Sequence, residues 1–143
     1  MRALALICAP GATAHYPERA MHLAAVALRS RVGRVLLGPV QQRGYAALGF
    51  PRGLSDAERS YTTLDAAQQD FAQHGADVEA LTCPVLLAWA EDDPLIPLPL
   101  ADELAARAPA GPRLRFPDGG HNLQKSKAVE LAAALRTLDP AGG

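Results

Sequence analysis

Residues 84–97, PVLLAWAEDDPLIP, decide the fold of this chain. An apolar run from Val85 to Ala90 ends abruptly in Glu91, Asp92 and Asp93. A short, continuous apolar run bounded by turn residues is typical of a strand buried on both faces of a parallel sheet. We therefore predict a strand over 85–90 that delivers carboxylates into the loop after it.

The same order, a strand and then a polar residue, recurs further along the chain. Residues 113–116 predict a short strand, and a Pro-Asp-Gly-Gly break separates it from His121. Apolar residues at helical spacing predict helices over 100–108 and 128–138, the second stopped by Pro140. Alternating strands and helices imply a parallel sheet with helices on its faces, and functional residues of such sheets gather at the carboxyl ends of the strands. We expect Asp93 and His121 to lie at that edge.

The first 18 residues, MRALALICAPGATAHYPE, permit two interpretations. Arg2, the apolar run after it and the Ala12-Thr13-Ala14 pattern fit a signal peptide. Against this, the segment is short for a signal peptide, and Pro10 and Gly11 interrupt it. An apolar run stopped by proline and glycine also fits a third buried strand. We favour the strand, because it also accounts for the rest of the chain.

The region from residue 11 to residue 80 indicates a helical insertion. Helices are predicted over 17–30 and 55–74, and Ser55 with Glu58 forms a capping-box pattern at the start of the second. Turn signals stand at Gly33, at Gly38 with Pro39, over 49–53 and at Gly75. We predict a single domain over 1–143, in which residues 11–80 form a lid-like insertion.

The composition excludes several classes of partner and suggests no cofactor. The chain has 143 residues, of which 49% are hydrophobic and 20% are charged, and its net charge of -1 offers no electrostatic basis for binding nucleic acid or a membrane. The apolar runs are too short to span a bilayer, which favours a cytoplasmic protein. Cys8 and Cys83 lack metal-site spacing and are expected to be buried thiols. Glu18 and His22, four residues apart, are a weak metal candidate without a third ligand, so no metal site is predicted.

These segments resemble the C-terminal part of the α/β-hydrolase superfamily. In that family a strand ending in G-x-x-D-x-x-[VI]-P carries the acid of a catalytic triad, and a later Gly-His turn carries its histidine. The resemblance assigns these roles to Asp93 and His121, with Ala90 where the glycine is usual. It implies three parallel strands with flanking helices and a helical lid, the first strand being the one that follows the nucleophile helix.

The chemistry of such a pair has its own physical logic. A hydroxyl is a poor nucleophile at neutral pH, so a histidine must take its proton while a carboxylate holds the imidazole in the correct tautomer. His121 would move the proton, and Asp93 would orient the ring. The structural alternatives are a helix cap or turn role for Asp93 or its neighbour Asp92, and a turn role for His121.

The residues that would complete a hydrolase are not found in these 143 residues. No G-x-S-x-G elbow occurs, and Ser30, Ser55, Ser60 and Ser126 neither follow a predicted strand nor lie between glycines. We expect a hydrolase-type chain for small carboxylic esters or acyl substrates that is inactive alone. The alternative is a non-catalytic remnant or interaction module whose exposed first strand associates with itself or with a complementing N-terminal chain.

Overall fold

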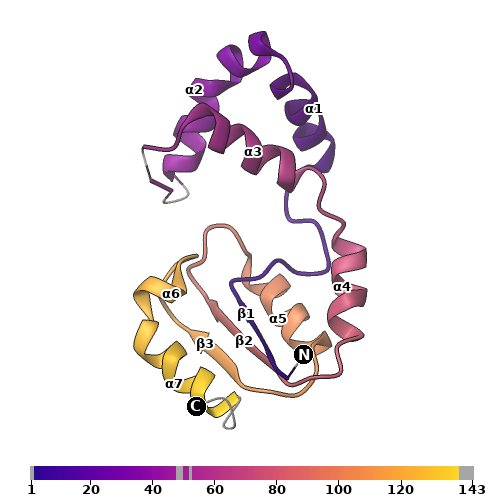
Figure 1. The fold of residues 1–143 in the computed structure, drawn as a ribbon, viewed down its shortest axis with the longest axis vertical. Helices are drawn as coiled ribbons and strands as arrows, with labels where there is room; N and C mark the ends of the chain where they lie inside the picture. Colours follow the sequence, from indigo (N-terminus) through magenta and orange to yellow (C-terminus); the bar gives the residue numbers. More distant parts are fainter. Residues whose placement is uncertain (1, 48–49, 52, 139–143) are drawn as a thin grey trace. The chain divides into compact units, whose positions relative to one another are not determined.

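The computed structural model describes residues 2–47, 50–51 and 53–138 of the chain. The chain divides into two compact units: a sheet unit made of residues 1–15 and 71–143, and a helical unit made of residues 16–70 (Figure 1). The helical unit covers fewer residues than the predicted insertion over 11–80, because residues 11–15 and α4 (Phe71–Glu79) belong to the sheet unit. Its function as a lid stays a prediction.

The sheet unit contains three parallel strands in the order β1-β2-β3. They are β1 (Leu4–Ile7), β2 (Val85–Ala90) and β3 (Arg113–Phe116), and Leu4 pairs with Val85 while Leu87 pairs with Arg113. The parallel register places the carboxyl ends of all three strands at one edge. The predicted fold class, three parallel strands with flanking helices, is confirmed, and residues 4–7 form the predicted first strand.

The middle strand is buried on both faces, because successive side chains of a strand point to opposite sides. On one face, Val85, Leu87 and Trp89 pack with α4 and with α5 (Leu98–Arg107). On the other face, Leu86, Ala88 and Ala90 pack with the short α6 (Leu123–Ser126) and with α7 (Ala128–Leu138). The continuous apolar run of β2 is therefore the centre of a three-layer core, and it fixes where the loop after Ala90 emerges.

The helical unit is formed by α1 (Glu18–Leu28), α2 (Arg31–Ala47) and α3 (Asp56–Ala66). The capping box at the start of α3 is confirmed: the Glu58 N–H donates to Ser55 Oγ, and the Ser55 N–H donates to the Glu58 carboxylate. Gln41 and Tyr45 of α2 contact Thr63 of α3 through hydrogen bonds of 2.8 and 3.1 Å. These polar contacts join the second and third helices of the unit.

Two turns predicted in the helical unit are wrong. Turns were predicted at Gly33 and at Gly38 with Pro39, but α2 runs through all three positions. Ser30 explains where α2 starts, since its hydroxyl accepts the Gly33 N–H. Position 33 requires a glycine, because an added Cβ would lie 1.9 Å from the Ala27 carbonyl oxygen of α1. Close packing of two helices, and not a turn, requires this glycine.

The single helix predicted over 55–74 is in fact two helices, α3 and α4. Asp70, a residue type that favours the N-cap position, immediately precedes α4 and marks the second start. The predicted turn over 49–53 lies partly outside the described residues, and the predicted helix stop at Pro140 lies wholly outside them. Gly75, predicted to be a turn residue, lies inside α4.

Within the part of the chain that the structure describes, no helix is both long enough and apolar enough to cross a membrane. The cytoplasmic location stays a prediction.

Candidate active site

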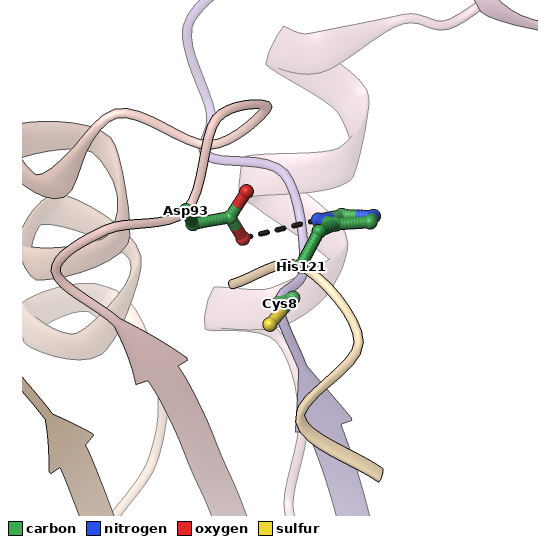
Figure 2. A group of neighbouring side chains, drawn as sticks. All are labelled: Cys8, Asp93 and His121. Carbon is green, nitrogen blue, oxygen red and sulfur yellow. Dashed lines mark hydrogen bonds and ion pairs between the residues drawn. The ribbon is translucent and has the colours of Figure 1, made fainter. Parts of the chain in front are cut away.

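Three polar side chains from distant parts of the sequence meet at the carboxyl edge of the sheet (Figure 2). Cys8 follows β1, Asp93 follows β2, and His121 follows β3 after a short turn. The nearest sulfur, oxygen and nitrogen atoms of these residues all lie within 4.8 Å of one another. The topology explains the meeting, because neighbouring parallel strands end at the same edge.

Asp93 is held in place by the backbone of its own loop. One carboxylate oxygen, Oδ1, accepts the N–H groups of Leu95 and Ile96 at 2.8 and 3.1 Å. The other, Oδ2, lies 3.0 Å from His121 Nδ1. The side chain is 1% exposed, so these three partners replace the water that an ionised carboxylate would otherwise bind.

The histidine is presented by a turn that requires two glycines. Gly119 and Gly120 have φ angles of 139° and 62°, in a region that other residues rarely adopt. The Asp92 carboxylate accepts the Gly120 N–H at 2.8 Å, and this hydrogen bond lowers the pKa of Asp92. Asp92 therefore fastens the histidine turn to the loop after β2, while its neighbour Asp93 contacts the imidazole itself.

The arrangement of Asp93 and His121 suits proton transfer. With Nδ1 bonded to the carboxylate, the second ring nitrogen, Nε2, is left to exchange a proton with a reacting group. The His121 side chain is 29% exposed, so a reactant can approach it from solvent. The structure thus brings together the two residues that the sequence singled out, and their catalytic role stays a prediction.

Cys8 is a third member of this cluster that sequence reasoning did not place there. It is 6% exposed, and its φ of 49° is the one positive value among the described non-glycine residues. Its thiol contacts the Gly120 carbonyl oxygen at 3.7 Å. Burial, followed by the charge of Asp93, raises the pKa of the Cys8 thiol to about 12.

This environment does not suit Cys8 as a nucleophile. A nucleophilic cysteine needs a depressed thiol pKa and a base beside the sulfur. Here the raised pKa keeps the thiol neutral, and the imidazole nitrogen on the Asp93 side already bonds to the carboxylate. Figure 2 shows the sulfur on the Asp93 side of the ring, away from Nε2.

His15 is a further titratable neighbour that the sequence analysis passed over. Its ring packs edge-on against Phe71, with 5.6 Å between ring centroids. Burial lowers its pKa, and the charges of Asp93 and His121 also act on it. The sequence could have indicated this neighbour, because His15 lies on the segment that follows the first strand and leaves the carboxyl edge of the sheet.

The other residues considered from sequence lie elsewhere. Ser30 and Ser55 cap helices, Ser60 is buried in α3, and Ser126 donates its hydroxyl hydrogen to the Gly119 carbonyl oxygen at 2.8 Å. As the sequence indicated, no serine of the described chain follows a strand. Glu18 and His22 are exposed on α1 of the helical unit.

Comparison with solved structures finds the same fold in several bacterial proteins. An enol-lactonase from Burkholderia xenovorans matches with a TM-score of 0.66 at 16% identity, over 96% of this chain and 56% of that protein. An esterase from Thermogutta terrifontis matches with a TM-score of 0.62 at 17% identity, over 94% and 54%. An α/β-hydrolase fold protein from Burkholderia ambifaria matches with a TM-score of 0.60 at 23% identity, over 96% and 56%.

Neither protein-family models nor curated protein sequences give a match. The structural likeness shows the fold: the chain has the architecture of the C-terminal part of an α/β-hydrolase. More particularly, it spans about half the length of the solved proteins that it matches. The predicted fold resemblance is thereby confirmed, and the activity is a separate question.

We predict that Gly119→Ala destabilises the sheet unit more than Gly120→Ala. Both substitutions place a side chain at a positive φ, which costs about 1–3 kcal/mol. A Cβ at Gly119 would also lie 2.6 Å from Leu123 Cδ2, whereas a Cβ at Gly120 meets nothing within 4 Å. Urea unfolding followed by Trp89, the single tryptophan and part of β2, measures the difference. Equal losses for the two variants would contradict this account.

We also predict that the stabilising effect of Asp92 depends on pH. Its pKa is lowered in the folded chain, so its charge contributes stability above the ordinary aspartate pKa, and this contribution is lost as the pH falls through the lowered value. Asp92→Asn should therefore be less stable than the wild type at neutral pH, and the difference should vanish in strong acid. Trp89-detected unfolding at both pH values tests this, and a pH-independent difference would refute it.

Proposed function

We propose that Asp93 and His121 are the acid and the histidine of an α/β-hydrolase catalytic triad. The observation that carries the proposal is the 3.0 Å contact between His121 Nδ1 and Asp93 Oδ2, made by a buried carboxylate whose other oxygen is held by two backbone N–H groups. These contacts restrain the carboxylate against rotating away from the ring. It selects the tautomer that leaves Nε2 facing the reactant.

The proton follows a short path in this arrangement. Nε2 of His121 takes the proton of a nucleophile hydroxyl as its oxygen attacks an acyl carbon, and later returns a proton to the leaving group. Asp93 stays ionised throughout and stabilises the positive imidazolium that forms between these steps. The reaction also needs backbone N–H groups to stabilise the developing oxyanion.

The proposed substrates are small carboxylic esters or related acyl compounds. Two of the structural neighbours support this class, since one is described as an esterase and another as an enol-lactonase. Both names refer to acyl–oxygen bonds, which a nucleophile, histidine and acid can cleave.

The nucleophile is proposed to come from residues outside these 143, either in the same polypeptide or in a complementing chain. Each serine of the chain lies apart from the strand ends, and the thiol of Cys8 is held neutral on the Asp93 side of the imidazole. Without the nucleophile and the oxyanion donors, covalent and electrostatic catalysis are lost together. Residues 1–143 alone are therefore expected to be inactive.

The first experiment tests whether residues 1–143 act alone. The purified polypeptide is incubated with a chromogenic short-chain ester, and we expect turnover no faster than that of His121→Ala. Hydrolysis by the wild-type polypeptide that disappears in His121→Ala would contradict the predicted inactivity.

The second experiment tests the triad in a complete protein. The coding DNA upstream of Met1 is read for an in-frame G-x-S-x-G, and an extended polypeptide carrying it is assayed with the same ester. We expect Asp93→Asn to reduce kcat by about 10⁴-fold, because the imidazole is then held in the wrong tautomer. Asp102→Asn, on the exposed surface of α5, is the matched control and should retain activity. Equal activity of the two variants would refute the role of Asp93.

The alternative function is association through β1, and a specific feature of the strand favours it. β1 pairs with β2 on one side, and the described residues place no strand on its other side. Leu4 and Cys8 donate their N–H groups to Pro84 and Ala88, so the alternation of a strand directs the N–H groups of Ala5 and Ile7 to the open side. An apolar strand with unpaired backbone groups is a template for another strand.

Ala5→Pro tests this alternative, because it removes one N–H from the open side while the hydrogen bonds to β2 remain. We expect the wild type to associate with increasing concentration in sedimentation velocity, and Ala5→Pro to shift towards the monomer. The control is Leu6→Pro, which alters the side paired with β2 and should instead lower the unfolding midpoint. A wild type that stays monomeric at every concentration would refute association between copies.

A further inference from the structure

Cys8, Asp93 and His121 form a set of three ligand types at one point of the sheet edge. They offer a sulfur, a carboxylate oxygen and an imidazole nitrogen within 4.8 Å of one another. Thiolate, imidazole and carboxylate are the ligands that zinc takes in proteins, and three protein ligands with one open position is a common zinc arrangement. We propose that these three residues form a binding site for a soft divalent cation, with Zn²⁺ as the best-suited ion.

The spacing of the atoms supports this proposal. Asp93 Oδ2 and His121 Nδ1 are 3.0 Å apart, close to the roughly 3.3 Å that separates two such ligands around tetrahedral zinc. The set as a whole spans up to 4.8 Å, so cation binding needs a contraction of about 1 Å. Each ligand follows a different strand of one sheet: Cys8 comes directly after β1, Asp93 lies in the loop after β2, and His121 follows the turn after β3. The topology therefore brings the three ligands together before a cation binds.

The charges and the burial also favour a cation. Cys8 is 6% exposed, and the Asp93 side chain is 1% exposed. An ionised Cys8 thiol would place a second negative charge beside the Asp93 carboxylate, away from water. Burial and this repulsion keep the thiol neutral when no cation is bound. A dication balances both charges. The partly exposed His121 side leaves an open position for water or another ligand.

Binding changes the protonation of the site in a defined way. The Cys8 thiol loses its proton to solvent as the sulfur–metal bond forms. His121, which carries its proton on Nδ1 in the hydrogen bond to Asp93, releases that proton to solvent and takes one up on Nε2, so that the Nδ1 lone pair binds the cation and the hydrogen bond to Asp93 is lost. Because Nδ1 cannot bind a metal and bond to Asp93 at once, the cation and the acid–histidine pair exclude each other. This inhibitory consequence rests on the proposed function, whereas cation binding itself does not.

The test is a titration of the purified, reduced protein with Co²⁺ in the absence of oxygen, followed by displacement with Zn²⁺. We expect one equivalent of Co²⁺ to bind with a thiolate-to-cobalt charge-transfer absorption. Cys8→Ala and Cys8→Ser should both lose this band, with affinity lowered by about a hundredfold or more, because a direct ligand matters at least as much as the residues that support one. Circular dichroism confirms that each variant is folded.

Cys83→Ala is the matched control. Cys83 is also buried, but it precedes β2 and so lies at the opposite end of the sheet from Cys8. This variant should keep the absorption band and the affinity of the wild type. Absence of the band in the wild type, its persistence in Cys8→Ala, or its loss in Cys83→Ala would each overturn the proposal. The titration reads no hydrolysis, so its failure is distinguishable from failure of the proposed function.

Discussion

The buried carboxylate of Asp93 is the constraint on which the site depends. A negative charge that is almost fully removed from water has to be compensated, and the chain does this with two backbone N–H groups and the imidazole of His121. The two N–H groups come from residues 95 and 96, so the loop after β2 must fold back on itself immediately. Pro94 and Pro97, which flank these donors, restrict the conformations open to that loop. Burial of β2 on both faces then decides where the whole loop stands.

The position of His121 depends on a second, weaker set of contacts. β3 is short and only partly buried, so it offers less packing to hold the histidine than β2 offers to Asp93. The turn before His121 compensates through Gly119 and Gly120, whose backbone conformations bring the ring back over the edge of the sheet. Asp92 ties this turn to the neighbouring loop through the Gly120 N–H. The two adjacent aspartates therefore have different roles: Asp92 holds the turn, and Asp93 contacts the imidazole ring.

The sequence predicted the features that neighbouring residues determine, and it missed those that depend on contacts between residues far apart in the chain. The strand and helix pattern of the sheet unit is local, and the parallel sheet follows from it by general rules of connection. The contact between Asp93 and His121 could be predicted, because both residues follow strands of a parallel sheet and because the family resemblance assigns paired roles to the same two residues. Cys8 was missed because it lies 85 residues from Asp93, and nothing local shows that the first strand pairs with β2. In the helical unit, the sequence predicts a turn at Gly33, because the close approach of α1 that requires a glycine there is a tertiary contact.

The hydrolase and association hypotheses meet at the open side of β1. A strand that paired with β1 in parallel would end at the same edge as Asp93 and His121, about 4.8 Å from the end of β1. A residue at the end of that strand would lie on the far side of Cys8 from Asp93, since β1 is the outer strand and β2 is its inner neighbour. An antiparallel partner would instead bring its carboxyl end to the opposite edge, where Cys83 lies. Association alone is therefore not evidence for the proposed catalytic triad, because the direction of the added strand decides whether its terminal residues can reach the imidazole.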